Sequence, residues 1–126
     1  MKMTTEQIKE KAQKIGKDCS LVTFGSTAIY ALHGGDSEMR VVWFTIFDYD
    51  TPICEIRAMQ DLRDNYGICT YRKYSGWKHS VSTTKHTKQA LELIAMAIDV
   101  KFGKWVDTNA IFNNIDKKDI SPFYGL

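Results

Sequence analysis

The sequence predicts an α+β fold in which an antiparallel sheet of four or five strands packs against one main helix in the C-terminal half. Strand-forming residues gather in the middle of the chain, and segments with helical apolar spacing stand at both ends. The chain has 126 residues, of which 44% are hydrophobic and 25% charged. A chain of this length buries about two-thirds of its unfolded surface, so we expect residues 1–126 to form a single domain.

A short N-terminal helix is expected to begin at Thr4 or the next residue, because Gln7 follows Thr4 at the spacing of a capping box. The apolar residues after it recur at the spacing of one helical face: Ile8, Ala12 and Ile15. Gly16 is a candidate C-terminal stop for this helix.

Three predicted strands follow. Segments 21–24 and 27–31 are separated by Gly25, which suits a bulge or a tight corner. The His33–Asp36 segment contains consecutive glycines and is predicted to be a turn. Segment 41–47 is apolar on both alternating faces, which predicts a central strand covered on two sides.

The last two strands, 53–58 and 68–74, are predicted to form a hairpin. Alternation along the first of them gives two faces, with Cys54, Ile56 and Ala58 inward and Glu55 and Arg57 outward. Both strands mix packing residues with charged residues.

The main helix is expected from about Thr84 to Lys101, with Gly103 ending it. One apolar stripe runs along it: Leu91, Ile94, Ala95, Ile98 and Phe102. A short third helix is expected from Asp107 or Thr108 to about Ile115.

The net charge of +2 predicts no particular partner, but the charges are unevenly distributed. Segment 68–88 carries basic residues and no acid, whereas the charged residues of segment 36–50 are acidic except for Arg40. This distribution indicates either an anion-binding side or simply two solvated faces.

The start of the main helix places bases where the helix dipole favours acids. Backbone N–H groups, hydroxyls and lysines there describe an anion site, and aromatic residues just upstream suit stacking. The candidate binding residues are Arg72, Lys73, Tyr74, Trp77, Lys78, His79, Thr84, Lys85, His86 and Lys88. The alternative is an ordinary helix cap beside a solvated face.

Catalytic, metal and cofactor signals are weak. The cysteines Cys19, Cys54 and Cys69 have no CxxC spacing, which predicts free and mostly buried thiols in a reducing cytoplasm. The histidines lack metal-ligand spacing, and no cofactor motif is present, so we expect neither a metal nor a cofactor. Asp48 and Asp50 stand at a strand end, where a general acid and base could lie, although a turn is the commoner reason. The N-terminus is not of the secretory type, and no apolar run would span a bilayer.

Two motifs resemble a set of small uncharacterised phage-encoded proteins. The first is Tyr49-Asp50-Thr51-Pro52-Ile53, and the second joins Tyr74-Ser75 with Thr83-Thr84-Lys85-His86. In those proteins a Tyr-x-Thr-Pro strand start precedes a Tyr-Ser-x-Thr-Thr-Ser-Lys-His helix start. Here segment 76–82 splits the second motif, and Thr84 replaces its serine. The resemblance covers about 40 of the 126 residues and implies phage origin and a small compact module.

Phage proteins of this class often inhibit host machinery, so by analogy we expect a non-catalytic binding protein. Its expected role is inhibition of a host defence, such as a CRISPR or restriction system, or of a nucleic-acid enzyme. The expected partner is a host protein or a protein–nucleic acid complex in the cytoplasm of the infected cell. The alternatives are direct binding of nucleic acid or a nucleotide through segment 68–88, and a small hydrolase.

Overall fold

The computed structural model describes residues 3–61, 63, 66–73, 81–104 and 106–113, with the backbone alone for 66–73, 81, 110 and 112–113. The elements are α1 (Thr5–Lys17), β1 (Ser20–Phe24), β2 (Thr27–Gly35), β3 (Met39–Asp48), β4 (Thr51–Asp61), β5 (Tyr66–Lys73), α2 (Val81–Phe102) and α3 (Thr108–Asn113). The predicted α+β class, with an antiparallel sheet against a main helix in the C-terminal half, is confirmed. In the described part of the chain, no helix is long and apolar enough to cross a bilayer.

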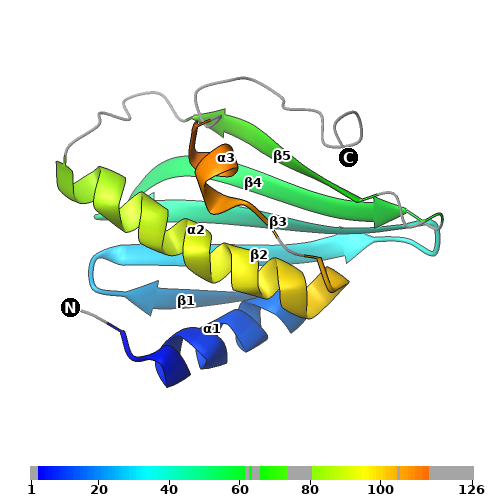
Figure 1. Ribbon diagram of the computed structural model, residues 1–126, viewed down its shortest axis with the longest axis horizontal. Helices are drawn as coiled ribbons and strands as arrows, with labels where there is room; N and C mark the ends of the chain where they lie inside the picture. The colour runs from blue at the N-terminus through cyan, green and yellow to red at the C-terminus, as the bar shows by residue number, and fades with distance from the viewer. Residues whose placement is uncertain (1–2, 62, 64–65, 74–80, 105, 114–126) are drawn as a thin grey trace.

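The strands lie side by side in chain order, β1-β2-β3-β4-β5, and every neighbouring pair is antiparallel. β3 is therefore the middle strand, as predicted. The helices lie on one face of the sheet (Figure 1). The inward side chains of β4 are the predicted ones, because Cys54, Ile56 and Ala58 are all fully buried. The core thus lies between this face of the sheet and the helices.

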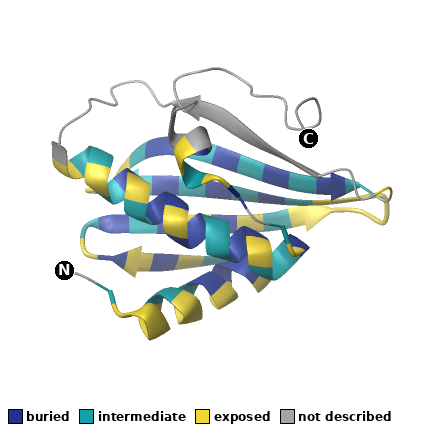
Figure 2. Ribbon diagram, viewed as in Figure 1, coloured by how far each residue is buried: buried dark blue, intermediate teal, exposed yellow. Residues whose placement is uncertain are grey.

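The predicted covering of β3 on both faces is wrong for the described part of the chain. From Val41 to Asp48 half-buried and buried residues alternate along this strand (Figure 2). Phe44 faces the helices and is fully buried, whereas Trp43 faces the other side and is only half-buried. There the Arg57 guanidinium lies 5.1 Å from the centroid of the Trp43 ring, a cation–π contact. In the described part of the chain this second face is half-buried, and the helices lie on the other face.

α1 begins as predicted, since the Thr4 side chain and the Gln7 side chain form a complete capping box. The prediction that Gly16 stops the helix is wrong, because the helix continues to Lys17. Gly16 is instead buried where α1 crosses α2, and a Cβ there would lie 2.8 Å from the Ala97 carbonyl oxygen. The glycine allows two helix backbones to approach closely.

Of two predicted turns, one is confirmed and the other is wrong. Gly25, with φ of 57°, makes the expected tight corner between β1 and β2. The predicted His33–Asp36 turn is wrong, because β2 extends to Gly35, which pairs with Arg40. The turn begins at Asp36 instead. Its Oδ1 accepts hydrogen bonds from the backbone N–H groups of Glu38 and Met39.

α2 starts at Val81, earlier than the predicted Thr84, and ends at Phe102 as the apolar stripe requires. Gly103 ends it in the left-handed conformation, and its N–H donates to the Asp99 carbonyl at 2.8 Å. Most of the predicted stripe is buried, and Ala95 is half-buried. The buried set is wider than one stripe, since it also contains Thr87, Ala90, Leu93 and Ala97. The wider set reflects contacts on two sides, with the sheet and with α1.

His33 joins three elements at the C-terminal end of α2. Its Nε2–H donates to the Ile15 carbonyl oxygen at 2.7 Å, and the Lys101 ammonium donates to its Nδ1 at 2.9 Å. These two contacts show that His33 is neutral and carries its proton on Nε2. Burial lowers the pKa of His33 below 6.5, the Lys101 charge lowers it further, and the Ile15 carbonyl and Asp18 act in the opposite direction.

We expect the free energy of unfolding to fall as the pH is lowered through about 6.5, because the unfolded chain then takes up a proton that folded His33 resists. The loss begins near the pKa of the unfolded chain and is complete below the pKa of the folded protein. Urea unfolding across this pH range measures it. His33→Gln keeps a polar side chain without a titrating group and should flatten the dependence. An unchanged pH dependence in this variant would show that other groups cause it.

Candidate functional site

Two hairpin turns and the N-terminal part of α2 meet at one end of the sheet. The first turn joins β1 to β2 at Gly25 and Ser26, and the second joins β3 to β4 at Tyr49 and Asp50. The N–H of Tyr49 donates to the Ser26 carbonyl oxygen at 2.9 Å, which ties the two turns together. Thr27 and Asp48 are cross-strand partners just behind them.

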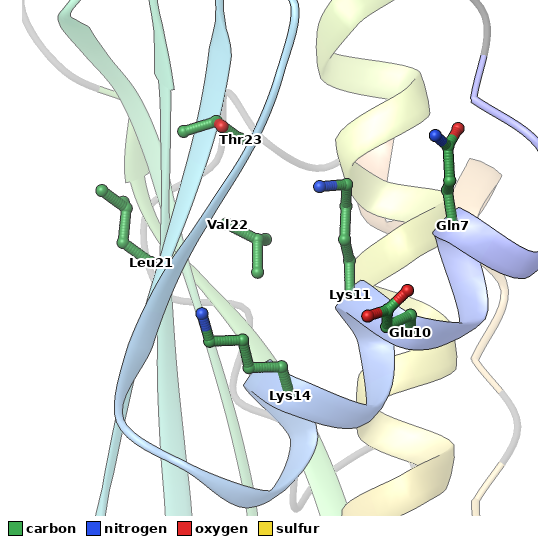
Figure 3. A pocket seen from close by; sticks show the side chains of 7 residues that line it. All are labelled: Gln7, Glu10, Lys11, Lys14, Leu21, Val22 and Thr23. Atoms are coloured by element: carbon green, nitrogen blue, oxygen red, sulfur yellow. The ribbon is translucent and has the colours of Figure 1, made fainter.

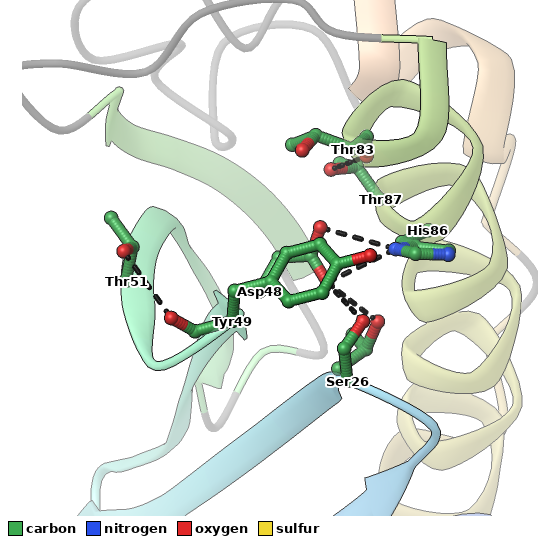
Figure 4. A network of polar contacts seen from close by, with 8 residues as sticks. Ser26, Asp48, Tyr49, Thr51, Thr83, His86 and Thr87 are labelled. Carbon is green, nitrogen blue, oxygen red and sulfur yellow. Dashed lines mark hydrogen bonds and ion pairs between the residues drawn. The ribbon is translucent and has the colours of Figure 1, made fainter.

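Asp48 is the centre of a polar cluster at this end (Figure 4). Its side chain is only 1% exposed, so its carboxylate needs partners from the protein. Oδ1 accepts hydrogen bonds from Ser26 Oγ at 3.0 Å and Thr27 Oγ1 at 3.1 Å. His86 Nδ1 lies 3.0 Å from Oδ1 and 3.1 Å from Oδ2. The two hydroxyls and the His86 imidazole thus each donate a hydrogen bond to the buried Asp48 carboxylate.

His86 extends from α2 and connects the helix to this strand end. With Nδ1–H donating to Asp48, Nε2 lies on the other side of the ring, which is 26% exposed. The sequence predicted His86 as part of a site for an external anion. The structure corrects this for the Nδ1 side, because the anion it contacts is Asp48 of the same chain. The predicted basic site and the predicted acid pair therefore adjoin each other.

Tyr49 stands beside this cluster in an unfavourable backbone conformation. Its φ is 50° and that of Asp50 is 62°, although neither residue is glycine. The left-handed region costs an ordinary residue about 1–2 kcal/mol, and aspartate tolerates it better than tyrosine does. Tyr49 is also 64% exposed, and its ring centroid lies 6.1 Å from that of His86. The two-residue turn between Asp48 and Thr51 requires positive φ at both positions, so the chain keeps an exposed tyrosine where asparagine or glycine would be less strained.

The remaining predicted residues of α2 are close to His86 in the sequence. Lys85 and Lys88 are exposed, and Thr84 is half-buried. Because α2 begins at Val81, Lys85 and Lys88 follow the first turn, whereas Thr84 is its last residue. The helix dipole acts mainly within the first turn, so Lys85 and Lys88 destabilise the helix less than the sequence predicted. The hydroxyls at the helix start are likewise inside the helix rather than before it.

The other predicted binding residues are less fully placed. Arg72 and Lys73 end β5, where they pair with Glu55 and Cys54 of β4, and their side chains lie outside the described residues. Tyr74, Trp77, Lys78 and His79 lie outside the described residues entirely.

The chemistry of the cluster differs from that of a hydrolytic triad. A carboxylate that fixes a histidine is one half of such a site. Here the hydroxyls of Ser26 and Thr27 donate to the carboxylate rather than to the imidazole. Burial raises the pKa of Cys54 to about 12, which keeps this thiol protonated. Cys19 is exposed, although the sequence predicted mostly buried cysteines. Within the described residues, no group of three His, Cys, Asp or Glu side chains could hold a metal ion.

Sequence reasoning missed Tyr49, Ser26 and Thr27 as members of the site. Thr27 joins it through strand register, which no local pattern encodes. The Tyr-Asp pair before Thr51 carries a turn signal, but nothing in it predicts an exposed tyrosine beside a helix. Comparisons with protein-family models, curated proteins and solved structures find no match.

Proposed function

We propose that the protein is a non-catalytic binding protein and that it contacts its partner through Tyr49, His86 and Lys85, here named the Tyr49 surface. The observation that carries the proposal is the conformation of Tyr49. It is the most exposed large hydrophobic residue of the described chain, and its backbone is held in the left-handed region. A turn selected only for stability favours asparagine or glycine at this position.

The chemistry of this surface suits a partner that combines an apolar patch with an anionic group. Tyrosine supplies a large contact area at a low entropic cost and is frequent among the residues that dominate binding energy. His86 offers the Nε2 side of its ring, because Asp48 engages Nδ1. Lys85 is exposed and adjoins it on α2. A carboxylate or phosphate on the partner complements these groups.

The resemblance of the two sequence motifs to phage-encoded proteins supports a host protein as this partner. The proposed role is inhibition of a host-defence or nucleic-acid enzyme in the cytoplasm of the infected cell. Both motifs that carry the resemblance contribute to the Tyr49 surface, because Tyr49 begins the first and Lys85 and His86 end the second.

Exchange of Tyr49 for asparagine tests the proposal, because it separates binding from stability. Asparagine accepts the left-handed conformation more readily, so we expect Tyr49→Asn to raise the free energy of unfolding by about 1 kcal/mol. We also expect it to abolish recovery of a nuclease-resistant partner from host lysate. Lys85→Glu should weaken recovery in a manner that high salt diminishes.

Tyr30→Asn is the matched control, since Tyr30 is 39% exposed on the face of the sheet opposite the helices. This variant should retain the partner. Equal recovery with Tyr49→Asn and wild type would refute the Tyr49 surface. Recovery of nucleic acid alone would favour the direct nucleic-acid alternative. Turnover that Asp48→Asn abolishes would favour the hydrolase alternative.

A further inference from the structure

β1 is an edge strand with one side unpaired in the described part of the chain. It pairs with β2 through a turn of Gly25 and Ser26, so Phe24 and Thr27 form the hydrogen-bonded pair that closes the hairpin. Hydrogen-bonded and non-hydrogen-bonded pairs alternate along an antiparallel ladder. The N–H and C=O groups of Leu21 and Thr23 therefore point away from β2, toward the open edge.

This edge lacks the charged residues, prolines and bulges that prevent strand addition at many sheet edges. Segment 20–24 contains neither a charged residue nor a proline, and its register with β2 is free of shifts. Leu21 on this strand is 52% exposed. By contrast β5, at the other edge of the sheet, contains Arg72 and Lys73. Charged residues and bulges are among the features that protect sheet edges, and β1 has neither, so β1 is the more receptive of the two edges.

A groove of about 400 Å³ lies along the same edge, between α1 and β1 (Figure 3). Its lining residues are Gln7, Glu10, Lys11, Lys14, Leu21, Val22 and Thr23. The amino groups of Lys11 and Lys14 extend from the helix toward the strand in this view. A strand added to β1 would occupy this groove, with every second side chain facing the lysines.

We propose that the β1 edge binds an extended acidic segment of a partner protein by strand addition. Its backbone pairs with Leu21 and Thr23, and its alternate side chains face either α1 or the open side of the sheet. The side facing α1 takes glutamate or aspartate because of Lys11 and Lys14. The other side takes apolar residues beside Leu21. The recognised pattern is acidic and apolar in alternation.

The charge of α1 favours such a segment over a second copy of the protein. Pairing two β1 edges would bring two α1 helices together, because each lies beside its own edge strand. The helix carries more lysines than glutamates: Lys9, Lys11, Lys14 and Lys17 against Glu6 and Glu10. Like charges facing each other disfavour that dimer, whereas the same lysines attract an acidic strand.

A short, labelled peptide in which glutamate and valine alternate is the probe, and fluorescence anisotropy measures its binding to the full chain. We expect binding that weakens with salt and is absent for a matched lysine–valine peptide. Thr23→Pro removes an N–H that β2 does not use and should lower the affinity about tenfold or more. Thr23→Val, the matched control, should leave the affinity unchanged. Lys11→Glu combined with Lys14→Glu should reverse the preference between the two peptides.

A second measurement avoids any change to the fold. The glutamate–valine peptide methylated on the amide nitrogens that face β1 cannot donate to the edge, and we expect it not to bind. Binding of this peptide, or of the unmodified one to Thr23→Pro at full affinity, would overturn the proposal. So would failure of the unmodified peptide to bind the wild-type chain. A wild-type dimer that Thr23→Pro dissociates would instead assign the edge to a second copy. Tyr49→Asn should leave peptide binding unchanged, so the two sites are tested separately.

Discussion

Replacing Asp48 with alanine is expected to lower the free energy of unfolding by about 3–5 kcal/mol, the largest effect of any change considered for this protein. The substitution removes the shared acceptor of Ser26, Thr27 and His86. Thr27 is 1% exposed, so water does not readily replace the lost partner. The loss also disconnects α2 from the strand end that holds the Tyr49 turn.

Asp48→Asn removes the negative charge of the side chain but keeps its size and shape. The amide keeps one oxygen that accepts from the two hydroxyls, but it loses the charge-assisted bond to His86. We expect it to cost clearly less than Asp48→Ala. Urea unfolding of these variants and of His86→Gln, singly and combined, gives the coupling energy between the two side chains. A coupling near zero, or a loss below about 1 kcal/mol for Asp48→Ala, would show that the cluster does not stabilise the fold.

Local patterns predicted those parts of the fold that depend on neighbouring residues in the sequence. The capping box at Thr4, the corner at Gly25 and the C-terminal glycine of α2 are each determined by a few adjacent residues. The failures at Gly16 and His33 have a different origin. Gly16 lies at a crossing of helices, and His33 lies in a strand that continues because its partner strand does. Tertiary contacts decided both cases.

The candidate site was predictable only as two separate parts. Charge patterning pointed to His86 and to Asp48, one as an anion binder and the other as a possible acid or base. Their contact depends on packing α2 across the sheet, and the sequence separation between them hides it. Tyr49 belongs to the motif that carries the phage resemblance, yet its exposure follows from a backbone conformation that composition does not reveal.

Gly16→Ala is expected to destabilise the protein by about 1–3 kcal/mol, although alanine is the better helix former. In an unconstrained helix the change would stabilise by about 1 kcal/mol. Here the new Cβ would lie 2.8 Å from the Ala97 carbonyl oxygen and 2.9 Å from Val100 Cβ. The first contact is with backbone, so relief requires α1 and α2 to move apart. That movement disturbs the buried interface next to Ile15.

Gly34→Ala is the matched control for Gly16, because its Cβ would meet only Val41 Cγ1, at 3.7 Å. We expect this variant to be neutral or slightly stabilised, since it restricts the unfolded chain without a clash. Adding Val100→Ala to Gly16→Ala should recover part of the loss, because it shortens the clashing side chain and leaves the carbonyl in place. Urea unfolding of the singles and the double measures this coupling. If Gly16→Ala were as stable as Gly34→Ala, the close approach of the two helices would not be what excludes a side chain at residue 16.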